Sequence, residues 1–101
     1  MIHVIASIQI EEGHLAEFIA IFKANMADVL GEQGCIEYAP TVDVPTGLAA
    51  QELNADVVTI VEKWDDLDAL RAHLAAPHMQ AYHKKVKDIV EKVTVKVLER
   101  A

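Results

Sequence analysis

The side chains best suited to moving protons lie in one segment of the chain, residues 57–90. This segment holds three of the five histidines, the only tryptophan and one of the two tyrosines among the 101 residues. Imidazole changes its charge near neutral pH, so His73, His78 and His83 are the natural candidates for acid–base chemistry. Any catalytic site is therefore expected around these three histidines.

His73 and His78 are the candidate catalytic residues, and either imidazole could act as a general base. For His73 the ordinary alternative is a histidine on a helix surface, or one in the core with its ring nitrogens hydrogen-bonded. His78 follows Pro77 and could simply occupy the first turn of a helix, and His83 precedes two lysines and could face solvent. Residue type and spacing leave these alternatives open.

The same histidines are not expected to hold a metal ion. They follow one another at intervals of five residues, whereas neighbours on one face of a helix lie three or four residues apart. Without help from a bend at Pro77, the trio would not converge on one ion, and its spacing supplies at most two of the ligands that zinc needs. The single cysteine, Cys35, excludes a Cys-rich zinc site and an internal disulfide, and is expected to be a small buried apolar residue. The sequence also has no Gly-rich phosphate loop for a dinucleotide, so we expect a protein without a metal or flavin cofactor.

The elements that must position the histidines can be predicted from the spacing of apolar residues. Alternation of apolar and polar residues predicts four strands, over residues 2–10, 35–42, 57–64 and 92–99. An apolar stripe predicts a long helix over residues 15–30, which Gly31 or Gly34 would end. Residues 43–56 have no sustained period and predict a long loop, of a kind that often carries function.

The histidines themselves fall on two further helices. Leucines at helical spacing follow Asp65, which could cap the first of these helices. Pro77 would stop that helix, because proline lacks the amide proton and clashes with the preceding turn. A second apolar stripe then runs from Met79 to Val90 at helical steps. The histidines are thus expected on either side of a break between two helices.

This order of elements predicts the fold class. A strand, a helix, two strands, paired helices and a last strand form the split βαβ or ferredoxin-like α+β pattern, with helices on one face of an antiparallel sheet. We expect one such domain over residues 1–101. Strands 2–10 and 57–64 carry aliphatic residues on both faces, for example Val4 and Ile5, whereas the helices can cover only one. A second copy covering the other face would make a homodimeric α+β barrel.

The composition and charge of the chain limit the classes of partner that it is expected to bind. The net charge is −7 and the pI is near 5.0, without an extended basic cluster, so binding to nucleic acid is not expected. No apolar run reaches the length of about 18 residues that a membrane span needs. Met1 leads directly into a strand without a basic region or cleavage site, so we expect a cytoplasmic protein that does not bind membranes.

Three motifs give the chain a resemblance to a known family. They are Gly34-Cys35-Ile36-Glu37-Tyr38, Glu62-Lys63-Trp64, and Leu70-Arg71-Ala72-His73-Leu74 followed by Pro77-His78. In their order and spacing the chain resembles the antibiotic biosynthesis monooxygenase domains, which are dimeric α+β barrels and include quinol monooxygenases. The resemblance spans nearly the whole chain. It implies a cavity between helices and sheet, and oxidation of an electron-rich aromatic by O₂ without metal or flavin.

The implied chemistry gives roles to further residues. A deprotonated dihydroxyaromatic can itself donate an electron to O₂, so the protein needs a base, a pocket that accepts an aromatic ring, and exclusion of water. His73 or His78 could be the base, and Trp64, Tyr38 and Phe22 could flank a planar substrate. A tryptophan in this position is more often an ordinary core residue than a surface for substrate. The remaining candidates for substrate binding are Glu62, which would orient an imidazole if covered but could be a solvated strand carboxylate, and His83.

Individual branches of the family can be compared at matching positions. The polyketide-oxidising branch has an Asn and a Tyr where this chain has Ile60 and Leu70, so that site is not reproduced. The haem-degrading branch binds iron through a histidine that falls on His83, but its companion Trp and Asn fall on His73 and Ala6, so haem is not expected. Residues 72–79 are equally similar to members that isomerise a phosphorylated sugar-like dicarbonyl. A non-oxidative isomerase or a small-ligand-binding dimer is therefore the alternative function.

Overall fold

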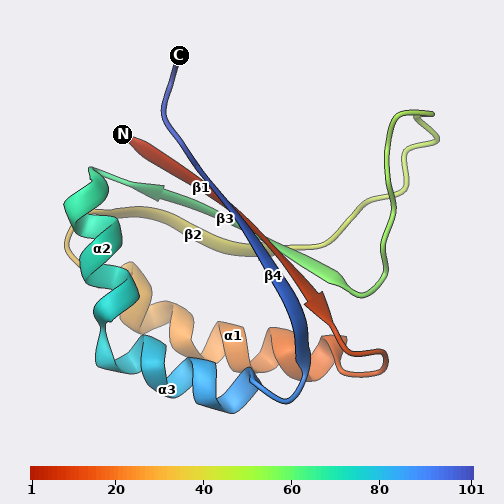
Figure 1. The fold of residues 1–101 in the computed structure, drawn as a ribbon, viewed down its shortest axis with the longest axis horizontal. Coiled ribbons are helices and arrows are strands. Elements are labelled where there is room, and N and C mark those ends of the chain that lie inside the picture. The colour runs from red at the N-terminus through yellow and green to blue at the C-terminus, as the bar shows by residue number, and fades with distance from the viewer.

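A computed structural model describes residues 1–101 and contains four strands and three helices (Figure 1). In chain order they are β1 (Ile2–Ile10), α1 (Leu15–Leu30), β2 (Cys35–Thr41), β3 (Val57–Trp64), α2 (Leu67–Ala75), α3 (Pro77–Val86) and β4 (Val90–Leu98). The predicted type and order of every element are confirmed. None of the helices combines the length and the apolarity that crossing a membrane requires.

The four strands form one antiparallel sheet in the order β2-β3-β1-β4. The helices lie on one face of the sheet, with α1 and α3 side by side (Figure 1). This is the ferredoxin-like α+β arrangement that the order of elements predicts. Strands β3 and β4 both pair with β1 over almost its whole length. The sheet is therefore continuous under the helices and forms one wall of the space between the two layers.

Alternation along β1 decides which side chains face the helices. Every second residue from Ile2 to Ile10 is buried, while those between them are half-buried on the outer face. On α1 the buried residues are Phe18, Phe22 and Val29. Leu30 does not belong to this face, because its side chain is 48% exposed at the end of the helix. The core therefore lies between the helices and one face of the sheet.

Helices α2 and α3 differ from the prediction in two details, the residue that caps α2 and the residue at which α3 ends. Asp66, not Asp65, caps α2, because Asp66 has the extended backbone of a cap and its carboxylate accepts a hydrogen bond from the Ala69 amide at 2.8 Å. Pro77 occupies the first turn of α3, where its missing amide proton costs nothing. The third helix also ends at Val86, so Val90 opens β4 and is not part of the helical stripe.

The segment between β2 and β3 forms the predicted long loop. It extends away from both the helices and the sheet (Figure 1). Apolar side chains on it are exposed, including Val44 at 65% and Leu48 at 69%. No residue of this loop lines the main cavity of the chain.

Candidate active site

A cavity of about 290 Å³ lies between the helices and the sheet. Its walls are mostly apolar and come from all four strands and all three helices. On the β4 side the wall consists of valines that are about half exposed, namely Val93, Val95 and Val97. The cavity is thus enclosed by the core on one side and reachable from solvent along β4, as a site for a small apolar ligand must be.

Aromatic rings form one end of the cavity. Phe22 and Tyr38 stack with centroids 4.9 Å apart and planes 16° apart, and Tyr82 meets Phe22 edge-on at 5.9 Å. Burial raises the pKa of both tyrosine hydroxyls, so they stay neutral and can act as hydrogen-bond donors. Flat apolar rings with polar tips suit a planar hydroxylated ligand.

Glu62 brings a carboxylate to the same cavity. It projects from the inner face of β3 and is only 7% exposed, so a solvated strand carboxylate is ruled out. One of its oxygens accepts a hydrogen bond from the Trp64 indole at 3.0 Å. Burial raises the pKa of Glu62, and the Trp64 hydrogen bond only partly opposes this shift. Glu62 is therefore a group that holds a proton more readily than an ordinary glutamate.

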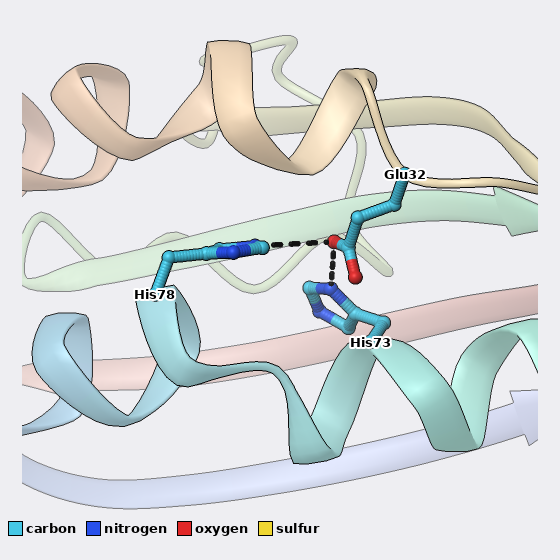
Figure 2. Close-up of side chains that lie close together, drawn as sticks. All are labelled: Glu32, His73 and His78. Atoms are coloured by element: carbon cyan, nitrogen blue, oxygen red, sulfur yellow. Dashed lines mark hydrogen bonds and ion pairs between the residues drawn. The ribbon is translucent and has the colours of Figure 1, made fainter.

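Two of the three histidines converge on one carboxylate that sequence spacing does not reveal. Glu32 Oε2 accepts a hydrogen bond from His73 Nδ1 at 2.7 Å and lies 3.3 Å from His78 Nε2 (Figure 2). The side chain of His73 is 2% exposed, that of Glu32 15% and that of His78 25%. The cluster thus reaches from the buried His73 out toward solvent at His78.

The helix break explains how the two histidines meet. In one continuous helix, residues five apart would point about 140° away from each other. His73 instead sits in the last turn of α2 and His78 in the first turn of α3, and the extended backbone of Ala76 between them redirects the chain. Both imidazoles consequently point toward the same place (Figure 2).

Gly34 explains how Glu32 reaches them. The turn between α1 and β2 packs so closely on α2 that a Cβ on Gly34 would lie 2.6 Å from the Ala69 Cβ. Gly34 also has a φ of +84°, a conformation that other residues adopt only with strain. Its carbonyl accepts a hydrogen bond from the Asp65 amide at 2.8 Å. These contacts hold the turn, and with it Glu32, against the helix that carries His73.

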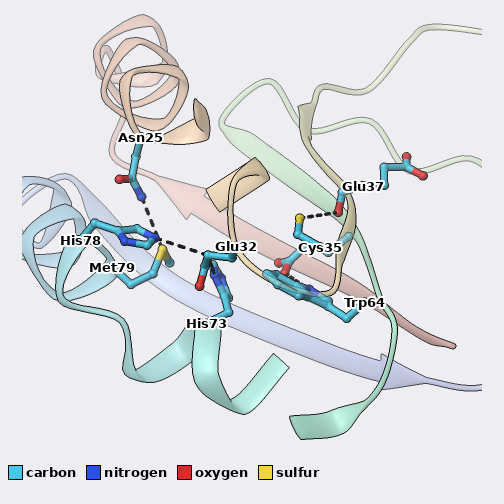
Figure 3. Close-up of polar contacts among 9 residues, drawn as sticks. Asn25, Glu32, Cys35, Glu37, Trp64, His73, His78 and Met79 are labelled. Atoms are coloured by element: carbon cyan, nitrogen blue, oxygen red, sulfur yellow. Dashed lines mark hydrogen bonds and ion pairs between the residues drawn. The ribbon is translucent and has the colours of Figure 1, made fainter. Parts of the chain in front are cut away.

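The surroundings of His73 favour its neutral form. Burial lowers the pKa of His73, while the hydrogen bond to Glu32 opposes part of that shift. The ring lies 4.6 Å from the Trp64 ring and 5.4 Å from the Tyr38 ring; Figure 3 shows Trp64 beside the Glu32–His73 pair. Because Nδ1 donates to a carboxylate, the lone pair of the neutral ring is on Nε2. His73 also lines the cavity and can accept a proton there.

The remaining predicted site residues divide into two groups. Phe22, Tyr38, Glu62, His73 and His83 all line the cavity, with His83 exposed at its edge. Trp64 is fully buried behind His73 rather than on the cavity wall, and His78 lines a smaller depression between α1 and α3. The sequence does not identify Glu32 as a site residue, because it lies in a polar turn, 41 residues from His73. Its position in the turn bounded by Gly31 and Gly34 is the only local signal that it is held in place.

An antiparallel sheet with one helical layer, an apolar cavity and a buried imidazole–carboxylate pair define a small α+β domain with a candidate active site. The sequence model for antibiotic biosynthesis monooxygenase matches residues 1–85. The probable quinol monooxygenase YgiN of Escherichia coli K12 is 36% identical over 101 residues, covering 98% of this chain and 97% of that protein. The chain therefore belongs to the antibiotic biosynthesis monooxygenase family, which supports a monooxygenase-type function.

Solved structures agree with this fold. A protein from Shewanella oneidensis is 30% identical, with a TM-score of 0.81, and the match covers 96% of this chain and 87% of that one. A protein from Methanosarcina mazei has a TM-score of 0.85 over 99% of this chain and 92% of that one, at 21% identity. The second likeness concerns the fold alone.

Proposed function

We propose that the protein is a cofactor-independent monooxygenase that oxidises quinol-like or other electron-rich aromatic substrates with O₂. The observation that carries the proposal is the buried His73, which is held by Glu32 and lies in the wall of an apolar, partly aromatic cavity. A base at the edge of a cavity suited to a planar ring is what such a reaction requires of the protein. The similarity to YgiN, a probable quinol monooxygenase, supports the choice of substrate class.

The first step is proton transfer. A substrate hydroxyl in the cavity gives its proton to Nε2 of His73, and the Glu32 carboxylate stabilises the imidazolium that forms. The tyrosines cannot take this role, because burial raises the pKa of Tyr38 and Tyr82 and keeps them protonated. Their hydroxyls can instead donate hydrogen bonds to substrate oxygens.

The second step belongs to the substrate and O₂. The deprotonated quinol donates electrons to O₂, one oxygen atom forms a bond to a ring carbon, and the other leaves as water. For a hydroquinone the products are a hydroxyquinone and water, and every electron comes from the substrate, so no external reductant is needed. The apolar walls limit the water that could quench the reduced oxygen intermediates.

The apolar lining also favours this function over isomerisation of a phosphorylated dicarbonyl. Phosphate is best held by cationic side chains, but Lys87 is the one lysine or arginine on the cavity wall, and the Glu62 carboxylate would repel a phosphate there. A small neutral dicarbonyl would still fit by size. The two functions differ in whether O₂ is consumed.

Oxygen uptake with a panel of hydroquinones tests the proposal. Untagged protein, dialysed against chelator, is expected to consume O₂ in proportion to its concentration, and heat-unfolded protein should not. With ¹⁸O₂, one labelled atom should appear in the organic product and one in water. Absence of protein-dependent uptake across the panel, or product without label, would contradict the oxygenase and favour the isomerase or a ligand-binding role.

The active unit is proposed to be a homodimer. Ile5, Val57 and Val61 project from the face of the sheet that carries no helix, and they are only half-buried in the single chain. A second copy related by a two-fold axis would cover this face with the same residues. Light scattering at micromolar concentration should give twice the chain mass of 11.1 kDa. A monomeric mass would exclude the dimer while leaving the cavity chemistry open to the oxygen assay.

A further inference from the structure

The cluster of Glu32, His73 and His78 has a second capacity besides orienting a base. Its three ligand atoms, one carboxylate oxygen and two imidazole nitrogens, all lie within 4.8 Å of one another. They come from three separate elements, namely the turn after α1, the end of α2 and the start of α3 (Figure 2). We propose that these residues bind a Zn²⁺ ion, and that the bound ion switches off His73 as a base.

Two of the three distances between ligand atoms suit such an ion after a small opening, and the third pair, the two imidazole nitrogens, lies within 4.8 Å. Zinc bonds nitrogen and oxygen at roughly 2.0–2.2 Å, so tetrahedral ligand atoms lie about 3.3 Å apart. Glu32 Oε2 and His78 Nε2 are already 3.3 Å apart. Glu32 Oε2 and His73 Nδ1, at 2.7 Å, must separate by a few tenths of an ångström once a metal replaces the shared proton. Rotation of the glutamate side chain can supply that movement.

The site is open to an ion from solvent. The side chains of His78 and Glu32 are 25% and 15% exposed, whereas that of His73 is 2% exposed and forms the inner wall. His78 also borders a depression between α1 and α3 that Asn25 and Asp28 help to line. Three protein ligands with one side toward solvent leave the fourth position to water. Lys85 lines the same depression and offsets the charge of Asp28, so the Glu32 carboxylate is the group that favours a cation over an anion there.

The ligand types select among ions. Two imidazoles and one carboxylate suit zinc and its first-row neighbours, while magnesium and calcium prefer oxygen ligands alone. Magnesium at the same concentration is therefore expected not to compete.

The effect on His73 follows from its tautomers. Without an ion, Nδ1 carries the proton donated to Glu32, and Nε2 keeps the lone pair that accepts the substrate proton. An ion on Nδ1 requires the lone pair there, so the neutral ring must carry its proton on Nε2. In that tautomer His73 has no acceptor for the substrate proton. This consequence rests on the proposed function, whereas the ion binding does not.

Zinc binding is tested on untagged, chelator-treated protein in competition with a chromogenic zinc chelator. One ion per chain is expected. The affinity should be at least tenfold weaker in His78→Ala and in Glu32→Gln, because removing even a residue that only hydrogen-bonds to a metal ligand lowers the affinity about tenfold or more. His14→Ala is the matched control, because His14 and Glu17 form a surface pair at 3.0 Å without a third ligand. Failure to bind one ion, or equal affinity in all three variants, would overturn the site.

The switch is tested by ¹⁵N NMR of the His73 ring, which distinguishes a protonated from an unprotonated ring nitrogen. The proton is expected on Nδ1 in the ion-free protein and on Nε2 after one equivalent of zinc. Unchanged protonation in the zinc-loaded protein would overturn the switch even if the ion binds. In the oxygen assay, zinc that saturates the site should abolish uptake by wild-type protein. Because binding and tautomer are read without substrate, failure of the quinol reaction itself would be seen separately.

Discussion

Two carboxylates serve the same small site in different ways. Glu62 and Trp64 stand two residues apart on one strand, and their hydrogen bond lies within the core. Glu32 instead meets imidazoles 41 and 46 residues away in sequence, at the edge of the helical layer. Glu62 has one neutral donor, whereas Glu32 has two donors that can become cations.

The difference shows that the neighbours of a buried carboxylate, and not burial alone, decide which charge state is favoured around it. With only an indole beside it, burial raises the pKa of Glu62 and favours its neutral form. Beside Glu32, a proton taken up by His73 creates an ion pair, so this carboxylate stabilises the charged state of the base. We therefore propose that the Glu32–His73 pair transfers the proton and that Glu62 contacts the substrate.

Replacing His73, the proposed base, should have the largest effect on the rate of the reaction. His73→Ala is expected to lower kcat by about 100-fold or more, because general-base catalysis contributes 10²–10⁴-fold. Oxygen uptake measures the rate, and circular dichroism checks that the variant folds. His83→Ala, which alters the exposed edge of the same cavity, should change the rate by less than about tenfold. If Glu62→Gln proved more damaging than His73→Ala, the assignments of the two carboxylates would have to be exchanged.

Replacing Gly34, in the turn that holds Glu32, should have the next largest effect, here on the stability of the fold. Gly34→Ala combines a positive φ with a Cβ contact at 2.6 Å, and should lower the free energy of unfolding by about 2–3 kcal/mol. Gly47→Ala is the matched control, since Gly47 has a φ of +76° but no atom near its Cβ. Only the conformational cost, about 1 kcal/mol, is expected there. Equal losses in urea unfolding would show that the close approach to α2 contributes nothing.

Neutralising Glu32 should affect turnover more than binding. Glu32→Gln keeps a hydrogen-bond acceptor for His73 but removes the charge, so kcat should fall about tenfold while KM changes less than about twofold. Glu37→Gln makes the same change of charge at a surface pair with Lys63 and should leave both constants unchanged. A rise in KM at constant kcat would instead place Glu32 in substrate binding.

Neutralising Glu62 should give the smallest effect, and one that depends on pH. The pKa of Glu62 is raised above 4.5, so above that pH the folded state binds more protons than the unfolded state. Stability contributed by this proton is thus present at low pH and is lost as pH rises through the folded pKa. Glu62→Gln should be more stable than wild type by about 1 kcal/mol at pH 7, and the difference should vanish below about pH 4. Urea unfolding at the two pH values measures this, and a variant less stable at pH 7 would show that the charge is well accommodated.

Local patterns in the sequence determined most of the fold. Alternation in β1 and β3 gives the buried face directly, because successive strand residues point to opposite sides. The stripe that contains Phe18 and Phe22 likewise gives the inner face of α1. Pro77 marks the helix break to the residue, since it can open a helix but not continue one. The cavity residues on these faces, including Tyr38 and Glu62, could be predicted for the same reason.

Only the tertiary structure decided how the polar groups combine. Helical spacing argued that His73 and His78 diverge, and that holds for a continuous helix, but the extended backbone at Ala76 turns both toward one point. Glu32 carries no periodic signal, and its place beside them depends on Gly34 packing against α2, a contact between residues far apart in sequence. Apolar periodicity reports which face of an element is buried, because burial acts on each element separately. It does not report which distant side chains a turn and a helix break bring together, because those distances depend on the packing of several elements at once.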